Sequence, residues 1–320
     1  MLSINAINMK ILFVCSGNSK NGLSSIIKNQ GESLKKYGLE VDYYTIKGKG
    51  LLGYCRNIFP LRKYIKKNTF SIVHAHYSLS AFVASFAGIK PLVASLMGSD
   101  VKSKQFYRFI IKFFHRFFWT KTIVKTEDMQ NSLQMKDILV IPNGVDLSKF
   151  KPLIKEIALK ETGWDTSMSH VLFAANPNRP EKNFELTKKA FELLNNQKLV
   201  LHYLKNVPNN KMVYYYNASD VILLSSLWEG SPNVIKEAMA CNISIVSTRI
   251  GDVEMLLSGV EGCYIAEFDP EDYAIKLHQA IKYSCLNGRT KSRKKITELG
   301  LDDQSVAKKI IDVYNDILPK

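Results

Sequence analysis

Long apolar runs and a leader sequence are both missing from this chain of 320 residues. A helix that crosses a bilayer needs about 20 consecutive apolar residues, and the longest apolar runs here are shorter. The N-terminus lacks the charged start, apolar segment and cleavage site of a secretory signal. These absences argue against a membrane-spanning protein and against a secreted one.

Cysteine is scarce and has no informative spacing. The chain has five cysteines, namely Cys15, Cys55, Cys241, Cys263 and Cys285. An odd number without any Cys-x-x-Cys pair fits neither a zinc site nor a redox pair. We therefore expect a cytoplasmic protein, and we expect no metal.

Acidic residues are few in the first half of the chain. Residues 1–150 hold 22 Lys+Arg and 8 Asp+Glu, a net of 22 − 8 = +14, whereas the remainder holds 22 and 21, a net of 22 − 21 = +1. This asymmetry predicts an anionic partner for the first half, which could be a membrane surface, a phosphate-bearing substrate or nucleic acid. The chain has no recognisable nucleic-acid motif and no ladder of stacking aromatics, so we expect no nucleic-acid partner.

Short apolar strands alternate with amphipathic helices in both halves, which indicates α/β architecture with parallel sheets covered on both faces. The strands expected in the first half are 10–15, 40–46, 71–76, 91–96, 122–126 and 138–143. Those expected in the second half are 170–175, 198–203, 220–226, 243–248 and 262–267.

The sequence predicts a domain boundary near residue 150, at an Asn-Gly turn followed by a proline. We expect residues 1–150 to form a basic domain and residues 151–300 a second domain. Residues 301–320 are expected to form a helix that packs back on the first domain. Two Rossmann-like doubly wound domains of this kind would face each other across a cleft, with ligands at the carboxyl ends of the strands.

A sharp turn follows the strand expected at 220–226. Ser231 suits the N-cap of a helix and Pro232 its first position, so the helix should run from Pro232 to about Ala240. The start of a helix carries unpaired N–H groups and a partial positive charge, which together favour binding of a diphosphate.

Two glutamates flank this turn at an interval of eight residues. Glu237 lies five residues beyond Pro232, about 7 to 8 Å along a helix axis. That distance suits a ribose attached to the diphosphate, and a carboxylate accepts hydrogen bonds from two vicinal hydroxyls. Glu229 stays in the loop, beside whatever group the diphosphate carries. The stretch therefore reads as a clamp for a nucleotide-sugar.

The stretch "EGSPNVIKE" resembles the E-x7-E motif of retaining GT-B glycosyltransferases, specifically glycosyltransferase family four. The resemblance covers nearly the whole chain. The segments "NGLSSIIKNQGESLKKYGLEVDYYTI", "SIVHAHYSLSA", "LMGSDV", "IVKTEDM", "IPNGVDLSKFKP" and "NPNRPEKN" fall in the order and at the spacings of that family.

The resemblance implies a role for each matching residue. It places Glu237 on the nucleotide ribose and Glu229 against the donor sugar. Arg179 and Lys182 would neutralise the diphosphate, although Asn176-Pro177 stand where the family usually has Gly-Arg. The turn that holds sugar and phosphates would comprise Gly230, Ser231, Pro232, Asn233, Val234 and Ile235.

Several further positions are ambiguous. Gly22 lies in the first loop, where it either opens a helix or lets the backbone approach a phosphate. Asn143 is either a turn residue or an acceptor contact. We interpret His74 and His76 as pointing to opposite faces of their strand, with His74 in the core and His76 a candidate for substrate contact.

Met97 stands where the family often has a histidine close to the donor sugar. A methionine can pack against a sugar, but it cannot relay a proton. Either this branch works without that histidine, or the protein binds a nucleotide-sugar without turning it over.

Residues 105–121 combine aromatics with Arg108, Lys112, Arg116 and Lys121, which predicts a helix with one basic face. One interpretation is a core helix with a solvated stripe. The other is a helix on an anionic bilayer.

The resemblance implies a retaining, metal-independent hexosyltransferase for polysaccharide or cell-envelope biosynthesis. The donor would be a nucleotide-sugar, with UDP the expected nucleotide, and the acceptor a hydroxyl of a glycan or a lipid-linked glycan. Contact with the inner face of an anionic membrane would then be peripheral. A catalytically silent nucleotide-sugar binder is the alternative, and epimerases of the GT-B fold form a related class of enzyme.

Overall fold

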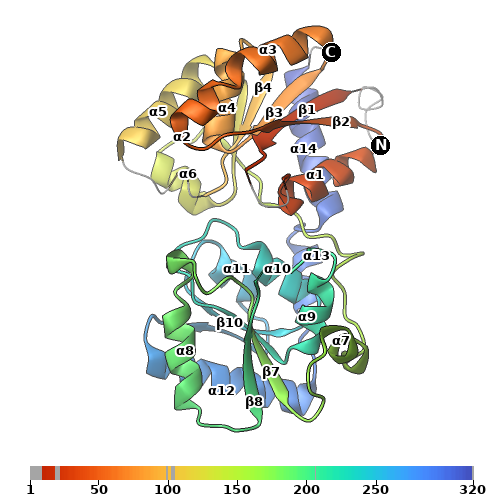
Figure 1. Cartoon of the computed structure of the whole chain (residues 1–320), viewed down its shortest axis with the longest axis vertical. Coiled ribbons are helices and arrows are strands. Elements are labelled where there is room, and N and C mark those ends of the chain that lie inside the picture. Colours follow the sequence, from red (N-terminus) through yellow and green to blue (C-terminus); the bar gives the residue numbers. More distant parts are fainter. Residues whose placement is uncertain (1–8, 19–21, 99, 102–104, 206, 319–320) are drawn as a thin grey trace. The chain divides into compact units, whose positions relative to one another are not determined.

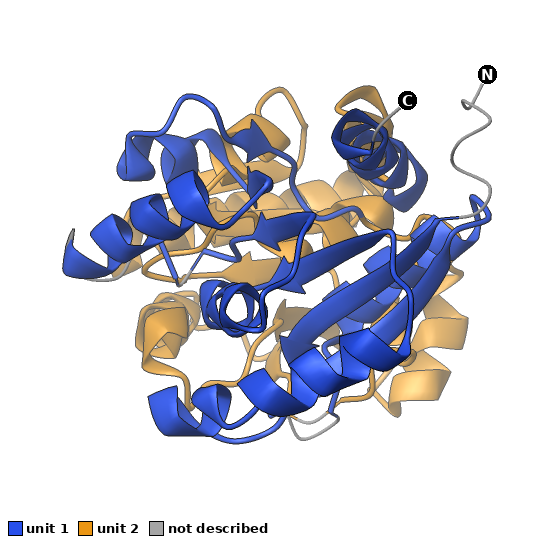
Figure 2. Cartoon of the chain, turned by 90° about the horizontal axis from the view of Figure 1, so that it is seen from above, with its two compact units in different colours: residues 1–144, 303–320 blue, residues 145–302 orange. Residues whose placement is uncertain are grey.

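The computed structural model describes residues 9–18, 22–98, 100–101, 105–205 and 207–318. The chain forms two compact units, coloured separately in Figure 2: unit 1 comprises residues 1–144 and 303–320, and unit 2 comprises residues 145–302. Each unit is a parallel sheet with helices on both faces (Figure 1). The predicted fold class, two Rossmann-like α/β domains, is confirmed.

The sheet of unit 1 has the strand order β2-β1-β3-β4-β5-β6, and every neighbouring pair is parallel. Its strands are β1 (Lys10–Ser16), β2 (Glu40–Ile46), β3 (Ile72–His76), β4 (Leu92–Ser95), β5 (Lys121–Val124) and β6 (Leu139–Val140). Its helices are α1 (Ser25–Lys35), α2 (Gly50–Cys55), α3 (Ile58–Lys67), α4 (Ser78–Phe86), α5 (Gln105–Phe117), α6 (Glu127–Leu133) and α14 (Asp303–Ile317).

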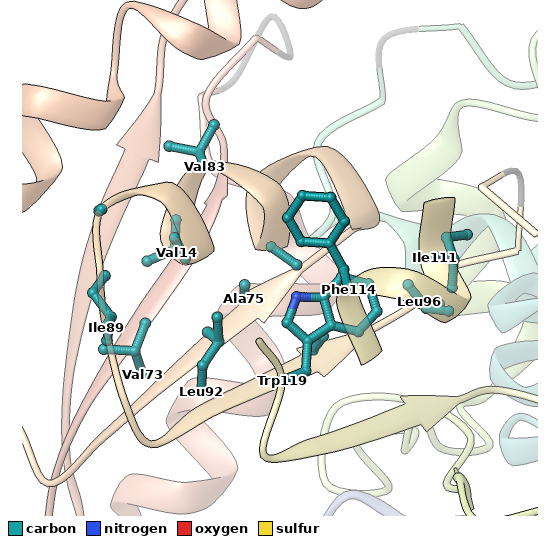
Figure 3. Close-up of a cluster of buried hydrophobic side chains, with 14 of the residues drawn as sticks. Val14, Val73, Ala75, Val83, Ile89, Leu92, Leu96, Ile111, Phe114 and Trp119 are labelled. Atoms are coloured by element: carbon teal, nitrogen blue, oxygen red, sulfur yellow. The ribbon is translucent and has the colours of Figure 1, made fainter. Parts of the chain in front are cut away.

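Alternation along β1 fills two cores, because successive side chains of a strand point to opposite faces of the sheet. Leu12 and Val14 join a cluster with residues of α4 and α5, part of which Figure 3 shows. Ile11 and Phe13 join a second cluster, with residues of α1 and α14. Each face of the sheet is thereby removed from water.

The sheet of unit 2 has the order β11-β10-β9-β7-β8, again parallel throughout. Its strands are β7 (Ser169–Phe173), β8 (Leu199–Tyr203), β9 (Val221–Leu224), β10 (Ser244–Thr248) and β11 (Cys263–Ala266). Its α-helices are α7 (Lys155–Thr162), α8 (Phe184–Leu193), α9 (Met212–Ala218), α10 (Asn233–Ala240), α11 (Val253–Leu257), α12 (Pro270–Asn287) and α13 (Ser292–Glu298), and η2 (Pro180–Lys182) is a short 3-10 turn.

The strand order of unit 2 defines where a ligand would bind. The connections run outward in opposite directions from the neighbouring strands β7 and β9, so the order reverses between them. In open parallel sheets the loops at the carboxyl ends of such a pair diverge and leave a crevice. The loops after β7 and β9 contain Arg179, Lys182 and Glu229.

Unit 2 begins at Val145, a few residues before the predicted boundary, because the segment 145–150 is held by unit 2. Phe150 is buried in the unit 2 core. The Arg293 guanidinium donates to the carbonyl oxygens of Leu147 and Phe150, at 2.7 and 2.6 Å.

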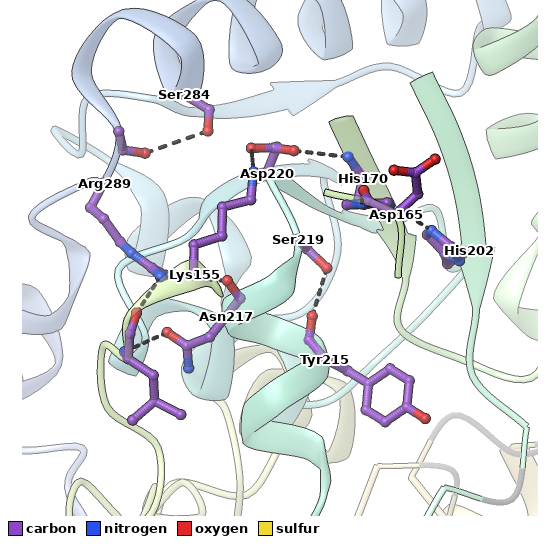
Figure 4. A network of polar contacts seen from close by, with 12 residues as sticks. Lys155, Asp165, His170, His202, Tyr215, Asn217, Ser219, Asp220, Ser284 and Arg289 are labelled. Carbon is purple, nitrogen blue, oxygen red and sulfur yellow. Dashed lines mark hydrogen bonds and ion pairs between the residues drawn. The ribbon is translucent and has the colours of Figure 1, made fainter. Parts of the chain in front are cut away.

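The chain beyond this segment is fixed by polar contacts (Figure 4). Asn217 accepts a hydrogen bond from the Leu153 amide at 2.8 Å, and Arg289 donates to the Leu153 carbonyl at 2.8 Å. Lys155 pairs with Asp220, which also accepts from the His170 amide at 2.8 Å. These bonds connect the residues at the beginning of α7 with the start of β7 and the end of α9.

The prediction that His74 and His76 point to opposite faces is wrong. Residues two apart in a strand share a face, and the two rings lie stacked with centroids 4.4 Å apart. His74 is a core histidine, as expected, with ring nitrogens 2.6 Å from the Tyr314 hydroxyl and 2.7 Å from the Ser95 hydroxyl. His76 is buried beside it, and burial holds the pKa of its ring well below the usual value.

The basic stripe predicted for residues 105–121 is shorter than expected, because α5 ends at Phe117 and keeps only Arg108, Lys112 and Arg116, spaced four residues apart. Arg108 is partly buried and donates to the carbonyl oxygens of Val101 and Ser132, at 3.1 and 3.3 Å. Lys121 lies beyond the helix, in β5, where it pairs with Asp316 at 2.7 Å. The helix also exposes four phenylalanines. Among the residues that the structure describes, no helix is both long enough and apolar enough to cross a membrane.

Candidate functional site

The loops after β7 and β9 are tied together at their bases. The Ser225 hydroxyl, at the end of β9, lies 3.0 and 2.9 Å from the carbonyl oxygens of Lys182 and Asn183. The Leu227 amide donates to the Glu181 carbonyl at 2.9 Å. The relative position of the two loops is therefore set by backbone and hydroxyl contacts.

These contacts bring two of the predicted site residues together. The Lys182 ammonium forms an ion pair with the Glu229 carboxylate, which also accepts from the Ser226 hydroxyl at 3.0 Å. Both side chains are mostly buried. A cation and a carboxylate thus lie at the carboxyl ends of the two diverging strands.

Arg179 does not join this pair. Its guanidinium donates to the Glu181 carboxylate at 2.7 Å, and more than half of its side chain is exposed. The Glu181 carboxyl has its pKa lowered by its own amide and by Arg179, against the opposing effect of burial. The structure therefore separates the two basic residues that the sequence suggests as partners.

The turn from Gly230 to Pro232 leads into α10, but its cap differs from the prediction. Pro232, with extended backbone angles, is the N-cap, and no side chain caps the helix start. Ser231 is buried and accepts a hydrogen bond from the Lys236 ammonium at 2.9 Å instead. The first amides of the helix, those of Asn233, Val234 and Ile235, have no carbonyl partner within the helix, which suits an anion.

Glu237 lies one turn into α10 with its carboxylate fixed by a buried tyrosine. The Tyr216 hydroxyl donates to Glu237 Oε2 at 2.7 Å. Burial raises the pKa of the Glu237 carboxyl to about 7, although Tyr216, Lys149 and Lys236 favour the ionised form. The group therefore changes charge close to neutral pH.

Neither Tyr216 nor Lys149 is among the residues that the sequence motifs single out. Lys149 precedes α7, and its ammonium binds the Asn209 side chain. Tyr216 faces Glu237 from α9, at a distance of 21 residues along the chain. No local pattern connects these residues to the helix, so the sequence carried no signal for them.

Lys236 supports the turn from Gly230 to Pro232 through its hydrogen bond to Ser231, a role that the sequence motifs do not indicate. Its side chain is fully buried, and burial lowers the pKa of its ammonium to about 8, while Asp252 and Glu237 oppose that shift. Asp252 belongs to the loop after β10. Burial raises the pKa of its carboxyl, and Lys236 and Ser231 oppose that shift. The sequence signal for this buried role is a charged residue within an apolar helix face, as in "NVIKEAMA".

Gly251 explains how that loop comes so close to the turn. Its φ of +53° lies in the left-handed region, and a Cβ at this position would lie 1.9 Å from the Gly230 carbonyl oxygen. Only glycine permits this approach without displacement of the backbone. The turn from Gly230 to Pro232 is thus packed directly on the β10–α11 loop.

The predicted site residues of unit 1 lie at or beyond the carboxyl ends of strands. Gly22, after β1, has a φ of +70° with open space where a Cβ would be. Met97, after β4, is half-buried, and its amide donates to Asp100 at 3.0 Å. Asn143 is buried beyond β6, in a small hollow that α1 and α14 also line. Substrate contact by these residues and by His76 remains a prediction.

Asp100 is a structural centre in this region that the sequence analysis did not identify. Its buried carboxylate accepts from the amides of Ser78, Met97 and Gly98 at 2.9 to 3.1 Å. Burial raises the pKa of this carboxyl, and the amide hydrogen bonds oppose that shift. The loop after β4 is thereby fastened to the start of α4.

Comparison with known protein families gives two matches that together span most of the chain. The model described as "Glycosyltransferase Family 4" matches residues 21–149. The model described as "Glycosyl transferases group 1" matches residues 170–282. The first falls within unit 1 and the second within unit 2.

Individual relatives agree with these models. An Escherichia coli protein named UDP-Gal:alpha-D-GlcNAc-diphosphoundecaprenol alpha-1,3-galactosyltransferase is 28% identical, over 82% of this chain and 80% of its own length. TuaC of Bacillus subtilis, named for teichuronic acid biosynthesis, is 27% identical over 58% of this chain, and the match spans about half (54%) of TuaC.

Among solved structures, the Anabaena protein HepE in complex with UDP superposes with a TM-score of 0.73 at 15% identity, over 96% of this chain and 100% of HepE. At that identity the likeness bears on the fold alone. Fold and matches together define a GT-B glycosyltransferase. The chain belongs to the group 1 glycosyltransferases of the family-four type, and it is an enzyme of the hexosyltransferase kind.

Proposed function

We propose that the protein transfers a hexose from a UDP-sugar, with retention of the anomeric configuration, to a hydroxyl of a lipid-linked glycan in cell-envelope polysaccharide biosynthesis. The observation that carries the proposal is the arrangement in unit 2. Lys182, on the loop after β7, pairs with Glu229, and Glu229, the first amides of α10 and Glu237 follow one another along the loop after β9 and its helix.

The relatives supply the chemical class of the substrates. The Escherichia coli protein is named for galactosyl transfer from a UDP-sugar to a sugar on diphosphoundecaprenol. A Campylobacter jejuni protein, 23% identical over 90% of this chain, is named for transfer to another diphospho-undecaprenol-linked sugar. A UDP donor and a lipid-diphosphate acceptor are therefore the first candidates to test.

The proposed reaction requires the unit 2 site to stabilise a departing diphosphate. The bond between the anomeric carbon and the β-phosphate oxygen breaks, and UDP leaves with the electron pair. The acceptor oxygen forms the new glycosidic bond, and its proton passes to the released UDP or to solvent. Negative charge grows on the diphosphate, so a fixed cation and helix amides beside it stabilise the transition state. Lys182 and the first amides of α10 would supply that stabilisation, and Glu237 would hold the ribose.

Product analysis tests this function directly. The purified protein should release UDP slowly from one UDP-hexose without acceptor, and faster with a synthetic lipid-diphosphate sugar. The anomeric proton coupling of the product, read by NMR, should match that of the donor sugar. GDP- and ADP-sugars serve as controls. Inversion of configuration would overturn the retaining assignment, and preference for another nucleotide would overturn the UDP assignment.

The methionine at position 97 is compatible with a second function, in which the protein binds a nucleotide-sugar without turning it over. Its side chain cannot relay a proton, and its amide is engaged with Asp100. Calorimetric binding of a UDP-sugar without hydrolysis or transfer over a panel of acceptors would favour this second function.

Acidification is expected to weaken donor binding. The pKa of Glu237 is raised to about 7, so lowering the pH from 8 to 6 protonates most of the carboxyl that would accept the ribose hydroxyls. About one tenth of the group stays ionised one unit below its pKa, which predicts up to about tenfold weaker binding at pH 6. Calorimetry with UDP-glucose measures this, because that ligand has no phosphate that titrates in the range.

The matched variant is Glu237→Gln, which should bind weakly at both pH values. A wild-type affinity that does not change between pH 8 and pH 6 would remove Glu237 from the ribose.

A further inference from the structure

The outward face of α5 is apolar. It exposes four phenylalanines: Phe106 is 74% exposed, Phe109 67%, Phe113 46% and Phe117 61%. At about 100° per residue, their Cα atoms fall within about 80° of one another around the helix. Ile111 and Phe114, on the other side, are buried in the core with Trp119 (Figure 3). The helix is thus apolar on two sides, although only one of them faces the core.

The neighbouring helices extend this surface. The large apolar side chains that are exposed in the described part of unit 1 all belong to α2, α3, α4 and α5, and they are Leu51, Leu52, Phe59, Phe86, Phe106, Phe109, Phe113 and Phe117. These four helices contribute to the same core cluster, on one face of the sheet (Figure 1). We call these eight side chains the apolar face. A contiguous exposed apolar patch marks an interaction site rather than ordinary surface, and ring contacts connect the members of the apolar face on α4 and α5.

Phe86 joins the α4 part of the apolar face to α5. Its ring centroid lies 5.4 Å from that of Phe114 and 6.4 Å from that of Phe118. Phe113 lies 5.7 Å from the same Phe114 ring, so the exposed rings of Phe86 on α4 and Phe113 on α5 are connected through the buried Phe114.

Basic residues predominate in the chain that carries the apolar face. Residues 43–126 contain 15 Lys+Arg and a single acidic residue, Asp100, whereas Asp137, further along the chain, pairs with His115 of α5 at 2.9 Å. Asp100 is buried and bound to backbone amides, so it does not contribute a carboxylate to the surface. The α3 helix alone contributes Arg62, Lys63, Lys66 and Lys67.

Two of these cations border the phenylalanines. Lys112 and Phe109 line a hollow of about 340 Å³ with Arg108, Ser132 and Gln134, between α5 and α6. Arg116, one turn further along the helix, is exposed. An anion in the hollow would meet Lys112 while an acyl chain beside it met the phenylalanine rings.

We propose that the apolar face docks on an anionic lipid bilayer, with the α5 phenylalanines at the boundary between headgroups and acyl chains. An anionic membrane fits this surface, because its headgroups attract the basic residues beside the phenylalanines while its acyl chains accept the rings. A purely apolar protein partner would not require these cations. The proposal extends the proposed function, since a lipid-linked acceptor lies in such a surface, but its test requires no turnover.

Co-sedimentation of the full chain with vesicles tests the proposal. Vesicles of equal parts phosphatidylglycerol and phosphatidylcholine should bind the protein, and vesicles of phosphatidylcholine alone much less. The difference should shrink with added salt, as the Debye length falls from about 30 Å at 0.01 M to about 3 Å at 1 M. Equal binding to both vesicles, or to neither at low salt, would overturn the proposal.

Two double variants separate the apolar and the charged contributions. Phe109→Ser with Phe113→Ser should lower vesicle partitioning by about tenfold or more, because both rings would leave the bilayer. The matched control is Leu193→Ser with Phe268→Ser, which removes exposed apolar side chains of unit 2. Lys112→Gln with Arg116→Gln should lower binding about tenfold or more at low salt. Arg108 is left intact because it binds two carbonyls of its own unit.

Each variant is checked by its melting temperature and by the nucleotide affinity of unit 2, which should stay at the wild-type value. An equal loss in the unit 2 control would overturn the assignment to α5. A wild-type dimer in lipid-free solution that the phenylalanine variants dissociate, with no vesicle preference, would assign the apolar face to a second copy of the chain instead.

Discussion

Replacement of Lys182 by alanine should lower kcat/KM for the UDP-sugar by about 10²- to 10³-fold, the usual cost of removing one fixed group that stabilises developing charge. Lys182 ends the loop after β7, and its ammonium lies against Glu229 at the carboxyl end of β9. Without Lys182 the Glu229 carboxylate would stand uncompensated beside the departing diphosphate, and its repulsion adds to the loss.

Initial rates of UDP release measure this effect. Lys188→Ala, on the exposed side of α8, removes the same charge from the same unit and is the control. Lys182→Arg should recover part of the activity, because the charge returns with a different reach. A Lys182→Ala loss no larger than that of the control would show that the ion pair with Glu229 is only structural.

The fold could be read from the sequence because its signals are local. Each expected strand coincides with an observed strand to within a few residues, since short apolar runs bounded by turn residues have few other solutions in an α/β chain. Strand order does not follow from local signals, and neither does the unit to which residues 145–150 belong. These residues belong to unit 2 because of contacts with Arg293, which lies more than 140 residues further along the chain.

The candidate site likewise has a part that local sequence signals predict and a part that depends on long-range contacts. Glu229, Glu237 and the turn between them fall within one stretch of nine residues, and the structure places that stretch on a loop and the first turns of a helix. The pairing of Lys182 with Glu229 spans 47 residues, and that of Tyr216 with Glu237 spans 21. Such contacts depend on how the strands are ordered, so residue types alone could nominate Lys182 but could not show Arg179 turned toward Glu181.

One prediction from the sequence is wrong for a definite physical reason: His74 and His76 lie on one face of their strand, because side chains two residues apart share a face. For the helix at 105–121, the spacing of the cations describes its basic stripe but not its orientation, because the core selects the orientation of a helix by its largest apolar side. Ile111 and Phe114 occupy that side, and the remaining phenylalanines are left outside. The excess of apolar residues over what the core could take was therefore the more informative signal.

The second large effect is expected at Lys236. Substitution of methionine for this fully buried lysine removes the positive charge that favours the ionised form of Asp252, whose carboxylate oxygens are buried. The cost of breaking a buried charge pair, about 3 to 5 kcal/mol, is the upper limit of the expected loss of stability. Replacing both partners, as in Lys236→Met with Asp252→Asn, should cost less than the single change, because no uncompensated charge remains.

Urea unfolding in a Trp119→Phe background isolates this effect, since the two remaining tryptophans, Trp164 and Trp228, both lie in unit 2. Lys188→Met on the exposed side of α8 is the control and should stay within about 0.5 kcal/mol of the parent protein. If the single and double variants are equally unstable, Lys236 acts through packing rather than through charge. A smaller loss in the double variant, accompanied by weaker UDP-sugar binding, would show that the buried pair holds the turn at Gly230 to Pro232 in its binding geometry, because Ser231 then lacks the ammonium that now fixes it.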